Sequence, residues 1–368
     1  MNLFAIAVLC AAYTADPDSV VRGVYINPWQ GANKDFMAQI FARADAGIIN
    51  AIVVDCKSDF GYLTYASTIP LAKKLKAVRP YLDLDSLIAE ARVHRVKFIA
   101  RIVCYRDNYL AGYGKFGMRD DEGHLWRDKT GSNWTNPYID SVADYLAEVV
   151  AELYRHGVSS VALDYIRFPT DGAVGRIRLT KVKGPRYQPI VRFLKKVRDK
   201  TPEVEIGACV YGFTTWYDLP NLGQTLGKLG KHLDVVYPML YPSHFPADFK
   251  KEIGEVWRNY WIYFDSVKGA FAKLPARVKV VPFVQGFDLL AEQFDHDYVL
   301  SQLDGSLAAD AAGFLIWNPS CNYATSWTPI GWVYNSIRDR YARKIQDTHM
   351  TDTGRRYPGT DSPPSLSQ

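Results

Sequence analysis

The chain alternates between short runs of apolar residues and longer segments in which apolar residues recur with helical spacing. Eight apolar runs lie at 22–27, 49–55, 97–103, 159–164, 205–211, 233–238, 278–284 and 313–317. Within these runs valine and isoleucine follow one another without the polar alternation of a half-exposed strand. The pattern therefore predicts strands that are buried on both faces, as in a parallel sheet.

Helical patterns separate most of these runs. They cover 34–46, 83–94, 138–156, 186–200, 221–231, 249–273 and 295–311. Repeated strand–helix units of this kind predict an α/β fold, a single (β/α)8 barrel that occupies residues 20–345. An open doubly wound sheet is the alternative that the same pattern allows.

The longest connection, 104–137, follows the third predicted strand and is rich in glycine and aromatic residues. Long ordered loops of this kind are usually functional. We expect this loop to fold over the mouth of the barrel and to bring Trp126 or Trp134 near Asp164.

The two ends of the chain depart from this pattern. Residues 3–15 are apolar and end in small side chains, which predicts a signal peptide over 1–15 and a secreted or periplasmic protein. Residues 346–368 are polar and contain several prolines, which predicts a disordered tail. No other apolar run approaches the roughly 20 residues of a membrane span, so no membrane-spanning helix is expected.

Composition narrows the possible functions. Apolar residues make up 48% of the chain, which excludes wholesale disorder, and the net charge of +5 without a basic run argues against a nucleic-acid partner. The five cysteines form no CxxC pair and the seven histidines no HExxH motif, so neither a metal nor another cofactor is expected. Whether Cys56 and Cys104 form a disulfide stays open.

Polar and aromatic side chains follow the predicted strands, where barrel enzymes carry their active sites. The candidates are Asp55, Lys57, Asp59, Arg101, Asp164, Arg167, Trp216, Asp218, Tyr241, His244, Gln285, Asp288 and Trp317, with Trp134 from the long loop. Flat rings cover the C–H faces of sugars while carboxylates and amides bind hydroxyls, so this set predicts a carbohydrate ligand. Structural roles compete with these: Asp55 and Asp59 suit loop anchors, Lys57 and Arg101 suit ion pairs with them, and Trp317 suits core filling.

Two stretches, WRDKTGSNWTNPYIDSVADY and LDYIRFPTDG, resemble the putative glycosyl hydrolase domain family, a bacterial family among the barrel glycoside hydrolases. The segments GVYIN, IVVDCKSDFGYLTY, RIVCYRDNYLA, VYGFTTWYDLPNLGQ, VVYPMLYPSHF and PFVQGF are similar in order, so the resemblance covers about residues 22–340. It implies a barrel that acts on a glycan. It also identifies Asp55, Asp164, Arg167, Tyr241 and His244 as members of the family's motifs.

Glycosidic bond cleavage needs two carboxyl groups, one that donates a proton and one that is ionised. Asp164 is the first, because it directly follows a buried run and lies beside Arg167; Arg167 or Arg101 would keep it ionised. The second is Asp55 or Asp218, with Asp59 and Asp288 as further candidates. The sequence thus predicts a glycoside hydrolase for a polysaccharide or cell-envelope glycan. The alternative is a non-catalytic glycan-binding barrel, which is favoured by Gly286, where the family often has Asp, and by the lack of a Glu after the fifth strand.

Overall fold

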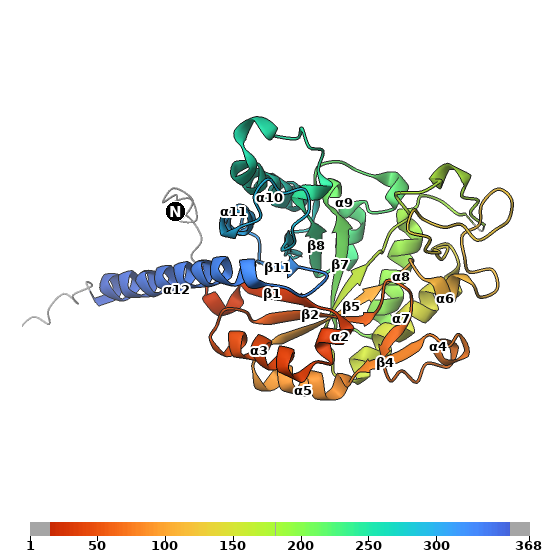
Figure 1. The fold of residues 1–368 in the computed structure, drawn as a ribbon, viewed down its shortest axis with the longest axis horizontal. Coiled ribbons are helices and arrows are strands. Elements are labelled where there is room, and N and C mark those ends of the chain that lie inside the picture. Colours follow the sequence, from red (N-terminus) through yellow and green to blue (C-terminus); the bar gives the residue numbers. More distant parts are fainter. Residues whose placement is uncertain (1–14, 181, 354–368) are drawn as a thin grey trace, which may run out of the picture.

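The computed structural model describes residues 15–180 and 182–353, with side chains as far as residue 343. Eight parallel strand positions form a closed barrel (Figure 1). They are β1 (Val21–Ile26), β2 (Ala51–Lys57), β5 (Lys97–Val103), β6 (Ser160–Asp164), β7 (Glu205–Tyr211), β8 (Val235–Met239), β9 with β10 (Lys279–Val280 and Phe283–Gln285) and β11 (Gly313–Trp317). Because β1 pairs with both β2 and β11, no edge is left open. The predicted (β/α)8 barrel is confirmed and the open sheet is excluded.

Helices surround the strands, as Figure 1 shows. The long ones are α3 (Lys34–Asp45), α5 (Leu84–Val93), α7 (Asp140–Arg155), α8 (Tyr187–Lys200), α10 (Glu255–Lys273), α11 (His296–Ala308) and α12 (Ala324–Thr353). The shorter ones are α2 (Pro28–Gly31), α4 (Pro70–Lys74), α6 (Asn108–Ala111) and α9 (Leu226–Leu229), with 3-10 turns at Pro17–Ser19, Val174–Arg176, Gly212–Thr215, Pro220–Leu222, Gly230–His232, Pro242–His244 and Lys251–Ile253.

Two helix predictions differ from what the structure contains. The helix predicted over 221–231 is broken into three short pieces, because Gly223 adopts a left-handed φ of 76° that ends the first of them. The helix predicted from residue 249 begins only at Glu255, after Gly254 with a φ of 77°. Positive φ at glycine carries little steric penalty, so Gly223 ends a short 3-10 turn, and Gly254 lies directly before the start of α10.

An insertion follows β2 that the sequence pattern did not reveal. Strand β3 (Leu63–Tyr65) pairs antiparallel with the end of β2, and β4 (Val78–Leu82) pairs with β3. The turn between β2 and β3 carries Asp59, Phe60 and Tyr62. This insertion therefore extends the barrel wall at the end where the strands finish.

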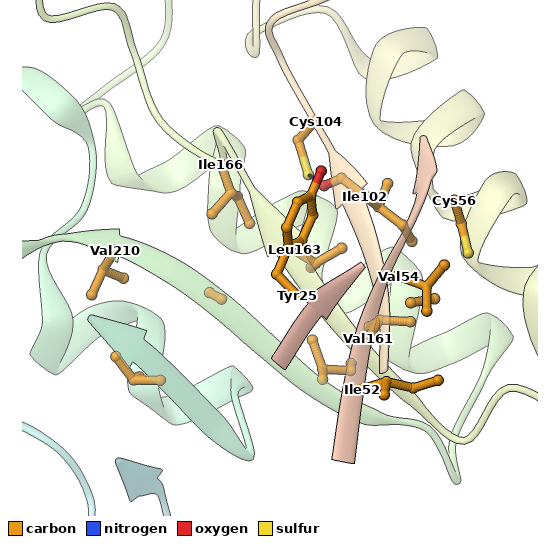
Figure 2. Close-up of a cluster of buried hydrophobic side chains, with 14 of the residues drawn as sticks. Tyr25, Ile52, Val54, Cys56, Ile102, Cys104, Val161, Leu163, Ile166 and Val210 are labelled. Carbon is orange, nitrogen blue, oxygen red and sulfur yellow. Dashed lines mark hydrogen bonds between the residues drawn. The ribbon is translucent and has the colours of Figure 1, made fainter. Parts of the chain in front are cut away.

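The core has two layers, one on each face of the strands. Between strands and helices lie apolar side chains such as Ile52, Val54, Cys56, Ile102 and Leu163, shown in Figure 2. Inside the barrel lie Ala51, Val53, Ile99, Ala162, Cys209, Tyr237, Phe283 and Leu315. All seven residues of β2 are buried, which explains why its sequence lacks polar alternation.

The predictions for the two ends of the chain, a signal peptide and a disordered tail, fall largely outside the described residues. Residues 1–14 of the predicted signal peptide lie outside the described residues. Residues 354–368 of the predicted tail also lie outside them. The first eight residues of that tail, 346–353, belong to α12. Cys56 and Cys104 are buried free thiols. Among the described residues, no helix is both long enough and apolar enough to cross a membrane.

Candidate active site

Strand alternation brings three charged residues to the inside of the barrel at one end. Asp55 lies two residues beyond Val53, and Asp164 lies two residues beyond Ala162, both of which face the barrel interior. Arg101 follows Ile99 in the same way. Successive side chains of a strand point to opposite faces, so all three enter the barrel near the C-terminal ends of β2, β5 and β6.

Arg101 joins the carboxylates of this mouth. Its Nη1 lies 2.6 Å from Asp55 Oδ1, and its Nη2 lies 2.8 Å from Asp164 Oδ2 and 3.1 Å from Asp59 Oδ1. Its Nε donates a further hydrogen bond of 2.9 Å to Asp164 Oδ2. Burial opposes the charge on Arg101, but the three carboxylates outweigh it and raise the pKa of this guanidinium well above its usual value. Arg101 therefore stays charged and binds the carboxylates of Asp55, Asp59 and Asp164 at the same time.

Asp55 is enclosed behind this arginine. Its Oδ2 accepts a hydrogen bond of 2.6 Å from the Tyr25 hydroxyl, while Oδ1 accepts one from Arg101. Burial raises the pKa of Asp55 to about 6, although Arg101 acts in the opposite direction. Asp55 does not line the pocket described next, and each of its oxygens already has a protein partner.

A pocket of about 210 Å³ opens beside the other two carboxylates. Its lining consists of Asp59, Arg101, Asp164, Tyr165, Arg167, Tyr211, Met239, Tyr241, His244, Phe283 and Trp317. This volume is below the roughly 300–1,000 Å³ of sites for drug-sized ligands, so it suits one sugar ring better than several. Two acids, two arginines and several rings therefore surround a space of monosaccharide size.

Asp59 and Asp164 share one nitrogen of Arg101. Because Nη2 contacts Oδ1 of Asp59 and Oδ2 of Asp164, these two oxygens lie at most about 6 Å apart. The Asp59 side chain is 37% exposed, and its Oδ2 makes no hydrogen bond or ion pair among the described residues. Asp59 thus lines the pocket and has one oxygen, Oδ2, without a protein partner among the described residues.

The turn after β6 holds Asp164 in place. The backbone N–H of Tyr165 donates a hydrogen bond of 2.6 Å to Asp164 Oδ1. Tyr165 has a φ of 47°, a left-handed conformation that costs a non-glycine residue about 1–2 kcal/mol. Asp164 therefore accepts N–H groups at both oxygens, and the strained turn supplies one of them.

Arg167 and the long loop support this turn from behind. The Arg167 guanidinium carbon lies 5.3 Å from the centre of the Trp134 ring and 5.2 Å from that of Tyr165. Trp134 is buried, and its Nε1 donates to Asp128 Oδ2 at 3.0 Å. The loop 104–137 does bring Trp134 beside the residue that follows Asp164. No residue of the loop lines the pocket, so Trp134 braces the site and does not form one of its faces.

Aromatic side chains form the opposite wall. Trp317 stacks on Tyr25 with ring centres 3.9 Å apart, and Arg101 lies 4.9 Å from the Trp317 ring centre. Tyr241 meets His244 edge to face at 5.1 Å. Burial lowers the pKa of His244, so its imidazole is neutral near pH 7. Trp317 lines the pocket together with Tyr241 and His244.

Besides Asp55 and Trp134, further residues proposed from sequence do not line the pocket. Lys57 is fully buried and pairs with Asp107 at 2.7 Å. Gln285 is buried and binds backbone atoms of Ser243, Phe287 and Leu289, and Trp216 donates to Ser266 Oγ on α10 at 2.6 Å. Asp218 is 68% exposed and lies 3.8 Å from Lys273 on the same outer helix. Lys57 and Gln285 are the last residues of β2 and β10, and Trp216 and Asp218 follow β7, but each side chain turns into the wall or outward.

Other residues of the mouth were missed or ranked low. Tyr165, Tyr211, Met239 and Phe283 line the pocket, and Tyr25 supports Trp317 from inside β1. Strand alternation could have found Tyr25, because it points inward one residue before β1 ends. Asp59, a lesser candidate from sequence, lines the pocket, whereas Asp288 is exposed and does not.

Comparison with known proteins agrees with the barrel. The sequence profile of the family described as "Putative glycosyl hydrolase domain" matches residues 23–323. A search of curated proteins found no match. The glycoside hydrolase domain of PgaB (BpsB) from Bordetella bronchiseptica is similar in structure, with a TM-score of 0.61 and 12% identity over 86% of this chain and 99% of that chain.

Two further solved structures share the fold at low identity. The spore cortex-lytic enzyme SleL of Bacillus megaterium has a TM-score of 0.50 and 11% identity, over 85% of this chain and 73% of that chain. The alpha-galactosidase TtGalA of Thermus thermophilus has a TM-score of 0.51 and 12% identity, over 91% of this chain and 65% of that chain. At such identities these likenesses show the fold alone.

Proposed function

Because the chain belongs to the putative glycosyl hydrolase domain family, we propose that its pocket hydrolyses glycosidic bonds in a polysaccharide or cell-envelope glycan. The observation that carries this proposal is the pair of pocket carboxylates, Asp59 and Asp164, held on one nitrogen of Arg101. The two oxygens that contact Arg101 Nη2 lie at most about 6 Å apart, which is closer to the roughly 5–5.5 Å between the carboxyl groups of retaining glycosidases than to the about 6.5–9.5 Å of inverting ones.

The two acids have different roles in this scheme. Asp164, with N–H donors at both oxygens, is the ionised nucleophile that forms a bond to the anomeric carbon as the glycosidic C–O bond breaks. Asp59, with its free Oδ2, donates a proton to the leaving oxygen, and later takes one from the water that releases the sugar.

The walls of the pocket would bind the sugar itself. Trp317 covers its apolar face, while Tyr241 and His244 offer polar groups to its hydroxyls. The scheme requires no metal or organic cofactor. A secreted or periplasmic location, expected from residues 3–15, would place the protein where envelope glycans are found.

One observation favours a second candidate, the non-catalytic glycan-binding barrel. Both oxygens of Asp164 and both of Asp55 already accept hydrogen bonds within the protein. A barrel that only binds sugars needs the rings of the pocket and not a free carboxylic acid.

Release of reducing ends from a panel of polysaccharides separates the two candidates. We expect turnover by the wild type and a loss of at least a thousandfold in Asp164→Asn and in Asp59→Asn, since each removes an essential group. Asp218→Asn is the matched control, because that acid lies outside the pocket, and it should keep wild-type turnover. Wild-type turnover by Asp164→Asn would refute the mechanism, and sugar binding by a wild type that releases no reducing ends would favour the binding barrel.

A further inference from the structure

Exposed aromatic side chains gather beside the pocket, on the insertion after β2 and its neighbours. We define the aromatic strip as Trp29, Phe60, Tyr62, Tyr81 and Tyr109. Trp29 and Phe60 are each 60% exposed and Tyr81 is 42% exposed, while the other two are half-buried. Single exposed rings are common on protein surfaces, but a contiguous group of this size is not.

The rings are in contact one after another. Phe60 lies parallel to Tyr62 with ring centres 6.4 Å apart, and Tyr62 meets Tyr81 at 6.1 Å. Trp29 continues the row at 6.0 Å from Tyr81, and Tyr109 flanks Tyr62 at 6.4 Å. Successive ring centres lie about 6 Å apart, so the row from Phe60 to Trp29 is longer than a single sugar residue.

The strip begins at the pocket wall. Asp59 lines the pocket, and Phe60 is the next residue. The turn that carries both is fixed: Ser58 N–H donates to Tyr62 O at 2.9 Å, and Asn108 N–H donates to Phe60 O at 3.1 Å. Gly61 has a φ of 101°, and a Cβ there would lie 2.1 Å from Asp107 Oδ1, so the turn needs glycine. The backbone that carries Phe60 and Tyr62 is thus held in position before any ligand arrives.

The chemistry of the strip favours sugars over a protein or a membrane. It consists of rings alone, and three of its five members carry a hydroxyl at the tip. The large exposed aliphatic side chains among the described residues, Val93, Val174, Val182, Ile253, Val256, Leu289 and Leu290, belong to other segments. Rings with polar tips cover the C–H faces of sugars and bind their hydroxyls, whereas a membrane-binding face would include such aliphatic side chains.

We propose that the aromatic strip binds the sugar residues of an extended glycan chain that continue from the residue in the pocket. This inference rests on the proposed function and names its substrate class: a polymer of several residues and not a disaccharide. Binding of a longer glycan should therefore be tighter because its additional sugar residues contact the strip. A short oligomer should contact the pocket alone.

Affinity electrophoresis tests the strip without relying on turnover. Native gels would contain hydroxyethylcellulose, galactomannan, glycol chitosan or soluble peptidoglycan fragments, and Asp164→Asn would serve as the background for all variants. We expect at least one of these glycans to retard the Asp164→Asn protein. Adding Trp29→Ala and Tyr81→Ala should weaken the affinity at least tenfold, as expected when two stacking rings are lost. Adding Trp257→Ala instead removes a ring on α10 that is 42% exposed, as Tyr81 is, and should change nothing.

A length series then separates the strip from the pocket. For the glycan that retards the protein, a hexamer should bind at least tenfold more tightly than a dimer, and the Trp29→Ala/Tyr81→Ala changes should remove only that difference. Equal retardation of the strip variant, or no retardation by any of the four glycans, would overturn the strip as a glycan surface. If the wild type releases no reducing ends while the strip variants still lose affinity, the hydrolase proposal fails and the strip stands.

Discussion

The buried acid Asp55 should make the stability of the folded protein depend on pH. Its pKa of about 6, against 3.8 in the unfolded chain, means that the folded protein binds more protons than the unfolded chain between about pH 4 and pH 6. The contribution of Asp55 to stability is therefore fully present below about pH 4 and is lost as the pH rises through 6. Two pKa units correspond to about 3 kcal/mol.

The variant Asp55→Asn isolates this term because asparagine does not titrate. From pH 4 to pH 7 the free energy of unfolding of the wild type should fall by about 2.4 kcal/mol relative to the variant, because about 0.5 kcal/mol of the full effect is already lost at pH 4. With about 2.1 cal/mol/K of unfolding entropy per residue, a chain of 368 residues should show a relative change in Tm of about 3 °C. The offset between the two proteins at pH 4 reflects packing and does not enter this comparison.

Thermal unfolding of both proteins in a series of buffers from pH 4 to pH 7 measures this change. Asp218→Asn is the control, because that side chain is 68% exposed and its difference from the wild type should not vary in the same direction. A difference between wild type and Asp55→Asn that is independent of pH, or that grows in favour of the wild type as the pH rises, would refute the assignment of Asp55 as a buried acid behind Arg101.

Three further substitutions test residues that the sequence placed at the site and the structure places in the wall. Lys57→Met leaves the buried Asp107 without its ion-pair partner and should lower the free energy of unfolding by about 3–5 kcal/mol in urea titrations, whereas Lys57→Met/Asp107→Asn should recover part of that loss. Gln285→Ala leaves the N–H of Ser243 and two loop carbonyls unpaired and should lower Tm with little change in KM; a raised KM at unchanged Tm would instead make Gln285 a ligand-binding residue. Trp216→Phe loses one hydrogen bond, so stability should fall by about 1 kcal/mol in urea titrations while kcat/KM stays at the wild-type value.

The architecture of the chain could be predicted from sequence because its signals are local and repeated. Unbroken apolar runs such as that of β2 are required where both faces of a strand are buried, and all eight predicted runs became barrel strands. The same rule placed Asp55 and Asp164 at the C-terminal ends of their strands. Where the prediction was wrong, as at 221–231, a glycine with positive φ ended a helix that periodicity alone suggested.

The details of the site could not be predicted because they depend on where side chains turn after the strand ends. Lys57 and Asp59 are two residues apart, yet the first is fully buried against Asp107 and the second lines the pocket. A register shift in β2 between Asp55 and Lys57 interrupts the alternation that would place Lys57 on the same face as Asp55, and no sequence pattern marks that shift. The role of Arg101 likewise depends on contacts with acids from β2, its turn and β6, which only the closed barrel brings together.

The anomeric configuration of the first product tests the central claim, that Asp59 and Asp164 act as a pair. Proton NMR spectra recorded in the first minutes of hydrolysis of a cleaved glycan identify the configuration of the new reducing end before it equilibrates. Because the facing oxygens of the two acids lie at most about 6 Å apart, the account predicts that the configuration is retained. An inverted product would require a carboxyl group farther from Asp164, and would contradict the pairing of Asp59 with Asp164.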